Sequence, residues 1–379
     1  MSGYLERERE TCQRLLPDLD KQLEECSLAE LERPGGPAIA LFKELGGAGL
    51  CVPTVHHGAG ATARDAVHVL RAIGARAPSL AIGTTMHHFS VASLVALAGS
   101  SAGFEGLLLE GVADDRRLMA SGFAEGRTGQ GILSPTMTAV PHTESGGWLV
   151  SGQKKPCSLA RSMDLLTASV ALPDGNGGTE LGVALIPAES PGMRVEPFWG
   201  SPVLAAAESD AVILDEVLVH PDLMIRPQLG LSGELDDLQT YGFIWFELLV
   251  AASYLGVASA LVETCLQRSR GTGSQLTDLA TRTEGAALCI EAVAAALDDG
   301  DRSNDVLARS LVARFTTAST VSSVVADAVE LLGGMAFISS GNVALLAAAS
   351  HAIGFHPPSR AAAADPLGAW FAGASLVLT

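Results

Sequence analysis

The strongest constraint on this chain is an apolar stretch of 22 residues, from Tyr241 to Val262, in which Glu247 is the only charged residue. The segment reads YGFIWFELLVAASYLGVASALV. It is long enough to cross a bilayer as a helix, but it has no flanking Lys or Arg anchors. We therefore interpret it as a buried helix of a bundle, and we expect no membrane partner.

Glu247 has two possible explanations. A carboxylate in such a stretch is costly to bury unless it is paired with a cation, protonated or used in chemistry. The simple explanation is a glutamate near the start of a long helix that faces water or an arginine. The other is a base kept in a dry pocket, where loss of hydration raises its pKa and makes it more basic.

The composition limits the classes of partner. Of 379 residues, 48% are hydrophobic and 17% are charged, which provides for a large core. The formal net charge is -18, so phosphate backbones and anionic lipid surfaces would repel the protein. We expect no nucleic-acid partner.

Cysteine and histidine placement indicates the compartment and the absence of a metal site. The six cysteines are dispersed without a CxxC pair, and the N-terminus MSGYLERERE has no apolar signal core. Both features predict a cytoplasmic protein with reduced thiols. The pairs His56-His57 and His87-His88 lack HxH or HExxH spacing, so no metal site is expected.

The spacing of apolar residues and of turn residues divides the chain into three parts. Residues 1–117 show helical spacing of apolar residues, 118–232 show short β-prone runs separated by Gly- and Pro-rich turns, and 233–379 return to long Ala- and Leu-rich helices. We predict an α+β protein with an N-terminal helical domain, a middle β-barrel or sandwich and a C-terminal four-helix bundle.

Three segments carry a more specific signal. Residues 121–130 read SGFAEGRTGQ and residues 150–158 read VSGQKKPCS, and both lie in the β unit. The third segment, 246–252, reads FELLVAA and contains Glu247. In this order, the segments resemble the acyl-CoA dehydrogenase family over about residues 40 to 360, which implies that family's fold and an FAD cofactor.

The resemblance implies roles for the first β segment. In the family, a strand end corresponding to Phe123 and Ala124 hydrogen-bonds the flavin pyrimidine through its backbone. The Gly-rich turn that follows includes Gly129 and approaches the thioester arm. Gln130 stands where the family usually has a Ser that contacts this arm, so it is a candidate substrate-binding residue.

The second β segment resembles the family's hairpin whose following strand lies against the flavin ring. Ser158 takes the position of a Thr that hydrogen-bonds the flavin on its N5 side. Pro156 takes the position of a stacking aromatic residue. Cys157 lies between them and is included among the expected cofactor contacts.

The helix that contains Glu247 resembles the first bundle helix of the family. In the isovaleryl and long-chain branches, the catalytic Glu comes from this position, and here the alternative loop, GFHPPS at 354–359, contains no acid. The resemblance therefore implies that Glu247 is the base. Tyr254, Phe355 and His356 are expected to bind the substrate, while the aromatic cluster Phe243, Trp245 and Phe246 is interpreted as core packing.

Two further segments imply contacts with FAD across a subunit interface. Arg268 stands where the family sends an Arg to the FAD pyrophosphate. The turn Glu330 to Gly334 resembles a turn that approaches the adenosine of the neighbouring subunit's FAD, with Glu330, Gly333 and Gly334 as the expected contacts. We therefore expect a homo- or hetero-oligomer, a dimer or tetramer.

The resemblance leads to one main functional prediction and two alternatives. The main prediction is FAD-dependent α,β-dehydrogenation of an acyl-CoA or carrier-bound acyl thioester. Glu247 would take the α-proton, flavin N5 would accept the β-hydride, and an electron-transfer flavoprotein would be the acceptor. The first alternative is a flavin monooxygenase or oxidase on the same fold, which needs no carboxylate base, so a spare buried Glu247 counts against it. The second is a paralogue without FAD that serves as a subunit of a hetero-oligomer.

Overall fold

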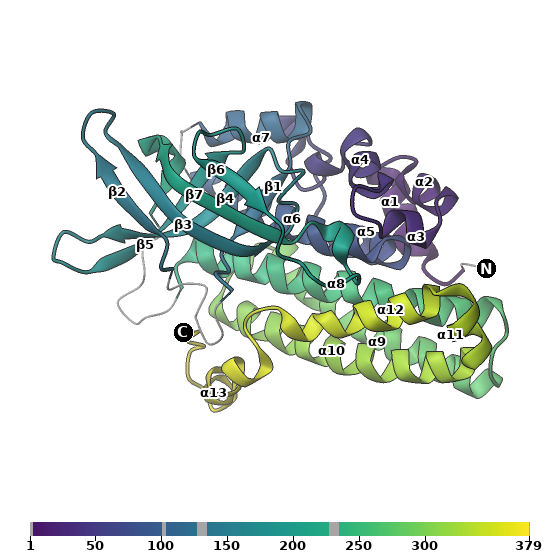
Figure 1. The fold of residues 1–379 in the computed structure, drawn as a ribbon. Coiled ribbons are helices and arrows are strands. Elements are labelled where there is room, and N and C mark those ends of the chain that lie inside the picture. Colours follow the sequence, from purple (N-terminus) through teal and green to yellow (C-terminus); the bar gives the residue numbers. More distant parts are fainter. Residues whose placement is uncertain (1–2, 101–103, 127–134, 227–234, 379) are drawn as a thin grey trace.

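The computed structural model describes residues 3–100, 104–126, 135–226 and 235–378. Helices come first, a β-sheet follows, and a bundle of long helices ends the chain (Figure 1). This order confirms the predicted α+β architecture.

The N-terminal helices pack beside the first bundle helix. The apolar run from Pro78 to Leu97 lies in one continuous helix, which contains no Pro after Pro78 and is not broken at Gly83. The helices of this part are α1 (Glu6–Leu15), α2 (Leu19–Glu25), α3 (Leu28–Leu31), α4 (Pro37–Glu44), α5 (Ala63–Arg76), α6 (Pro78–Ser100) and α7 (Glu105–Asp114).

The β unit is a single mixed sheet with the strand order β6-β7-β3-β2-β4-β5-β8, and β1 pairs with β4 in parallel. The β-prone runs at 148–150, 165–170, 181–186 and 211–219 lie in β3, β4, β5 and β7, and the strand end that the resemblance implies at Phe123 follows β1. The sequence did not predict β2, β6 and β8. The strands are β1 (Met119–Gly122), β2 (Thr138–His142), β3 (Gly147–Cys157), β4 (Leu165–Pro173), β5 (Thr179–Pro187), β6 (Met193–Glu196), β7 (Asp210–Val219) and β8 (Met224–Ile225).

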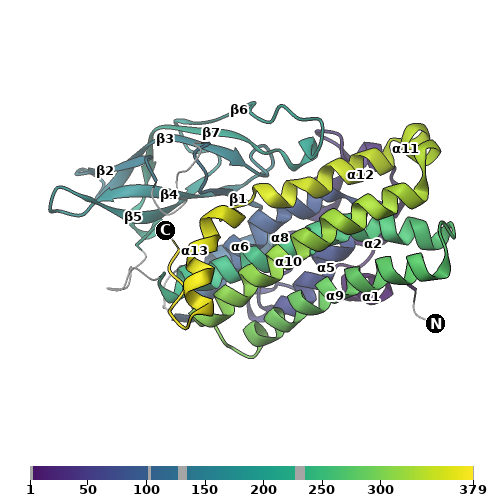
Figure 2. The same cartoon turned by 90° about the horizontal axis from the view of Figure 1, so that it is seen from below.

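The C-terminal part contains the predicted bundle, in which α8, α9, α10 and α12 lie side by side (Figure 2). The helices are α8 (Asp237–Gln267), α9 (Gly273–Asp298), α10 (Asn304–Leu332), α11 (Gly334–Ser340), α12 (Asn342–Ser350) and α13 (Arg360–Phe371). A short 3₁₀ helix, η5 (His351–Phe355), leads from α12 toward α13. The Asp236 carboxylate accepts from Gln239 N at 2.7 Å and caps the start of α8.

The apolar stretch is confirmed as a buried bundle helix. By length and composition, α6 and α8 are each long enough to cross a membrane. However, the most apolar window of α8 is 100% buried inside the protein. The helix therefore finds its apolar surroundings in α5, α6, α9, α10 and α12.

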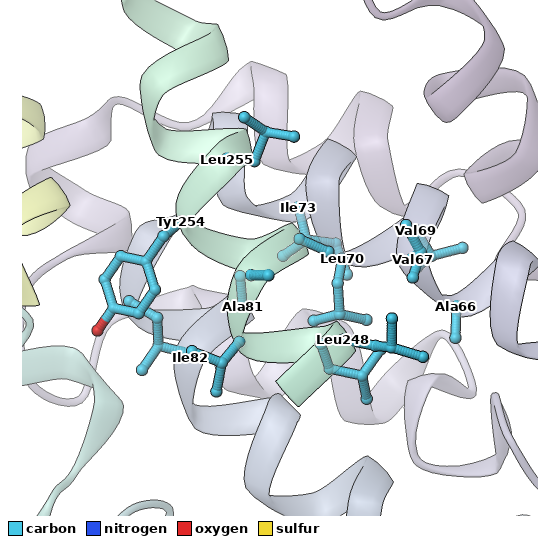
Figure 3. Packing of buried hydrophobic residues seen from close by; sticks show 14 of the residues in the cluster. Ala66, Val67, Val69, Leu70, Ile73, Ala81, Ile82, Leu248, Tyr254 and Leu255 are labelled. Atoms are coloured by element: carbon cyan, nitrogen blue, oxygen red, sulfur yellow. The ribbon is translucent and has the colours of Figure 1, made fainter. Parts of the chain in front are cut away.

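Helices α5 and α8 approach each other closely through two glycines. A Cβ at Gly256 would overlap the carbonyl oxygen of Arg71, and one at Gly74 would overlap that of Ser253. Around this crossing, buried apolar side chains of α5 face Leu248 and Leu255 of α8 (Figure 3). The two glycines therefore set how near α8 lies to the N-terminal helices.

We predict that Gly256→Ala destabilises the protein. The added methyl group improves helix propensity by about 1 kcal/mol, but forcing the backbones apart costs about 1–3 kcal/mol or more, so the thermal midpoint should fall. Gly285→Ala on α9 is the control, because no atom lies within 4 Å of the added Cβ. Calorimetry showing both variants to be equally stable would contradict the close crossing.

Candidate active site

A cavity of about 300 Å³ lies where the β-sheet meets the helices. Its walls come from α6, from the ends of β1 and β3, from the first half of α8 and from the segment after η5. This size falls at the lower end of ordinary ligand pockets, roughly 300–1,000 Å³. The cavity is therefore a candidate site for a small organic ligand or a ring of a larger one.

Aromatic rings form a continuous wall across these elements. Phe89 of α6 lies 6.2 Å from Phe123 and 5.6 Å from Phe246 between ring centroids, and Phe246 lies 6.0 Å from His356. The His356 ring in turn lies 5.5 Å from that of Tyr254. Such edge-on and tilted contacts are favourable for aromatic pairs and give the cavity a rigid, apolar side.

The described residues that line the cavity include no Asp, Glu, Lys or Arg. The polar side-chain groups of these described residues are hydroxyls, one amide, one indole and one imidazole. Ser158 Oγ and Ser209 Oγ lie 2.9 Å apart, and Thr167 donates to Ala120 O at 3.1 Å. The described walls can therefore orient a ligand through neutral hydrogen bonds but hold no charge against it.

His356 and Tyr254 are two titratable groups in this wall. The Nε2 of His356 lies 2.9 Å from the Tyr254 hydroxyl. Burial, together with the nearby Arg314 cation, lowers the pKa of His356 to about 3, so the imidazole is neutral at physiological pH. Burial also raises the pKa of Tyr254, which keeps the phenol protonated.

Glu247 lies outside the cavity and is paired with an arginine. Its Oε2 is 2.6 Å from Arg314 Nε of α10, and the two side chains are 0% and 2% exposed. Burial raises the pKa of Glu247 to about 7, an effect that the Arg314 charge opposes. Glu247 is not among the described residues that line the cavity, so this placement speaks against a base that faces a substrate.

Most of the other predicted contact residues that the structure describes in this region meet at the cavity. Its lining includes Phe123, Ala124, Pro156, Ser158, Tyr254, Phe355 and His356. Cys157 differs, because its side chain is fully buried in the core of the β unit, as expected for the residue between two that face the cavity. Gly129 and Gln130 lie outside the described residues.

The residues expected to contact FAD across an interface lie at the other end of the bundle. Arg268 ends α8, about 20 Å or more along the helix from the cavity-lining Tyr254 by helix rise. Glu330, Gly333 and Gly334 lie at the turn between α10 and α11. Within one chain these residues do not meet the cavity, and their approach to a neighbouring subunit's cofactor stays a prediction.

Sequence reasoning missed several residues of the site. Phe243 and Phe246 line the cavity, although they were interpreted as core; Trp245 of the same cluster is buried in the core. Apolar cavity walls and apolar cores use the same residue types, so no local signal separates them. Arg314 was also missed, because a lone Arg in a helix usually faces water.

Comparison with known proteins identifies the family. The profile of the acyl-CoA dehydrogenase C-terminal domain matches residues 239–354. Isobutylamine N-hydroxylase of Streptomyces viridifaciens is 47% identical over 375 residues, which cover 98% of this chain and 99% of that protein. The chain belongs to the acyl-CoA dehydrogenase-like family.

Other members of this acyl-CoA dehydrogenase-like family are monooxygenases. Dibenzothiophene monooxygenase of Rhodococcus qingshengii is 27% identical over 247 residues, covering 64% of this chain and 58% of that protein. The structure of FMN-bound TdsC from Paenibacillus sp. A11-2 has the same fold, with a TM-score of 0.86 at 18% identity over 98% of this chain and 99% of that one. The protein is a flavin-dependent oxidoreductase of this fold.

The cavity is chemically suited to a flavin ring. Phe123, Ala124, Pro156 and Ser158 come from two neighbouring strand ends and line one side of it, where the resemblance to the acyl-CoA dehydrogenase family places the ring. Their apolar surfaces and the Ser158 hydroxyl match a flat, largely apolar ring system with polar edges.

We predict that Ser121→Phe weakens flavin binding. Ser121 is buried at the end of β1 and lines the cavity, so a benzyl group there would occupy the ring's space. Titration of oxidised FMN, followed by quenching of flavin fluorescence, should show at least a tenfold higher Kd. Ser322→Phe on the exposed face of α10 is the control, and unchanged affinity in the Ser121 variant would place the flavin elsewhere.

Proposed function

We propose that this protein is a flavin-dependent monooxygenase that hydroxylates the nitrogen of a small, apolar primary amine. The observation that carries the proposal is that no described residue of the cavity wall is a carboxylate, since Glu247 is buried against Arg314. The 47% identity to isobutylamine N-hydroxylase over nearly the whole chain supports the choice of an amine.

This proposal replaces dehydrogenation as the main prediction. Removing the weakly acidic α-proton of a thioester requires a carboxylate that can touch the substrate, and the described cavity wall has none. The earlier objection to a monooxygenase, a spare buried acid, disappears because Arg314 pairs with Glu247. An acyl thioester and an electron-transfer flavoprotein are therefore no longer proposed as partners.

We propose FMN rather than FAD as the flavin, as in the FMN-bound relative. FMN has no pyrophosphate and no adenosine. The carboxylate of Glu330, which would be unfavourable close to a pyrophosphate, then needs no special orientation. Under this proposal there is no adenosine for Arg268, Gly333 and Gly334 to contact, and the turn at 333–334 has a structural role only.

The chemistry requires a reductant, and the chain provides the environment. Reduced flavin supplies two electrons and activates O₂, so that one oxygen atom forms an N–O bond with the amine and the other leaves as water. The aromatic wall from Phe89 to His356 keeps water away from the reacting atoms. The neutral His356 and Tyr254 present a hydrogen-bonding pair that can orient the amine nitrogen.

The uncharged lining also selects the form of the substrate. An alkylammonium ion would enter a cavity whose described walls offer no carboxylate, and an unpaired buried charge is costly. The free base avoids this cost and keeps the nitrogen lone pair that must form the N–O bond. We therefore propose that the amine binds in its neutral form.

The direct test supplies the purified protein with chemically reduced FMN, ¹⁸O₂ and isobutylamine. The expected product is the N-hydroxylamine carrying one ¹⁸O atom, detected by mass spectrometry. A panel of acyl-CoA thioesters is added to the oxidised holoprotein in parallel. Bleaching of the flavin by a thioester, without N-oxygenation of any small amine, would overturn the proposal.

The pH dependence of KM provides a second prediction. An alkylamine has a pKa of about 10, near that of the lysine side chain, so its neutral fraction rises about tenfold per pH unit below this value. KM expressed as total isobutylamine should therefore fall about tenfold per unit between pH 7 and 9. An arylamine that is neutral throughout this range is the control, and a pH-independent KM for isobutylamine would show that the cation binds.

A further inference from the structure

We infer that Glu247 and Arg314 are positioning residues that fix the backbone of residues 356–358 and, through it, the His356 ring in the cavity wall. The kinetic part of this inference rests on the proposed function, whereas its structural part does not. His356 and Pro357 line the cavity, so any shift of this segment changes the site.

Arg314 forms an ion pair with the carboxylate and donates hydrogen bonds to the segment. Nη1 donates to His356 O at 3.1 Å and to Pro357 O at 3.4 Å, and Nη2 donates to Pro358 O. Nε faces Glu247 Oε2 at 2.6 Å. The planar guanidinium thus holds three consecutive carbonyls on one side and is itself held by Glu247 on the other.

A second contact from α8 fixes the side chain of His356. Tyr254 lies two helical turns beyond Glu247 on the same helix face, and its hydroxyl is 2.9 Å from His356 Nε2. The backbone of the segment is therefore tied to α8 through Arg314 and Glu247, and the imidazole is tied to α8 directly. Together the two contacts leave the ring little freedom.

A contribution to folding stability alone does not explain the Glu247–Arg314 pair. Removing two charges from water costs about as much as their attraction returns, and buried ion pairs are often replaceable by apolar residues without loss of stability. Helices α8 and α10 pack closely against each other and bury many apolar side chains, among them Leu311 and Val321 of α10. What apolar residues could not supply is the set of donors to the three carbonyls.

The protonation of Glu247 makes its contact with Arg314 depend on pH. The charged and titratable groups near the pair are Arg314 of α10, Arg360 of α13, His356 of the segment and Tyr254 of α8. As the pH falls through about 7, Glu247 takes up a proton and its attraction for Arg314 weakens. A protonated glutamic acid then resembles glutamine at this position.

The main test is Arg314→Lys in the full-length holoprotein. Lysine keeps the positive charge near Glu247 but cannot donate to three carbonyls at once. We expect hydrogen–deuterium exchange of the peptide that spans 351–360 to rise at least tenfold, and kcat for isobutylamine to fall at least tenfold with a smaller change in KM. The exchange measurement needs no turnover, so it stands even if isobutylamine is not a substrate.

Arg71→Lys is the matched control. Arg71 is also buried and pairs with Glu8 at 2.8 Å, but it does not line the cavity. It should lower the thermal midpoint without raising exchange at 351–360 and without lowering kcat. If the two variants have the same exchange pattern and the same kcat, Arg314 has only a structural role and the inference is wrong.

Two more variants keep the test decisive if Arg314→Lys folds poorly. Glu247→Leu combined with Arg314→Met removes both charges, so it should retain the thermal midpoint but show the same rise in exchange. In Glu247→Gln, kcat should be independent of pH between 6 and 8, and the wild-type kcat should fall toward this lower value below pH 7. Wild-type kcat that stays flat across this range, or normal exchange in the double variant, would contradict positioning by the pair.

Discussion

The burial of the central part of α8, from Ile244 to Val262, is the constraint on which the rest of the structure depends. A polar side chain in this part of the helix cannot reach water, so burying it without a partner is costly. Ser253 hydrogen-bonds Thr85 of α6 at 3.0 Å, and Ser259 accepts from Arg71 of α5 at 3.2 Å. Glu247 and Tyr254 follow the same rule with partners from α10 and the segment after η5. The polar residues of α8 therefore orient it relative to its neighbours, while its apolar residues provide the packing.

This arrangement also explains the character of the cavity. The sheet meets the helices beside the first half of α8, where Phe243 and Phe246 line the cavity and Phe246 also packs against Phe89 of α6. Glu247, the single acid of the apolar stretch, is directed to Arg314 instead. The described walls are therefore aromatic and uncharged, which suits a neutral organic substrate and a reaction from which water is excluded.

The sequence was informative wherever a local pattern determines the structure. The apolar run around Glu247 predicted a buried helix, and the short β-prone runs between turn residues predicted the strands β3, β4, β5 and β7, because both patterns reflect local preferences of the chain. Phe123, Pro156 and Ser158, which the resemblance implies as flavin contacts, lie together at one cavity, and their contact with the flavin stays a prediction. The pairing of Glu247 with Arg314 could not be predicted, because the two residues lie on different helices. The residue pattern within one helix does not show which residue of another helix it contacts. For the same reason Phe246 was assigned to the core: an apolar residue looks alike whether it faces a neighbour or a cavity.

The identity of the neighbour decides what a buried acid does. Desolvation raises the pKa of Glu247 to about 7, and such a value would suit a general base at neutral pH. A base, however, must reach its substrate, and here the carboxylate faces a guanidinium that is already committed to three carbonyls. The same burial that makes an acid basic also makes it a strong partner for a cation. Because an arginine on the facing helix pairs with Glu247, this carboxylate supports the cavity wall and does not transfer a proton. The same fold can then carry out chemistry in which the protein supplies no carboxylate.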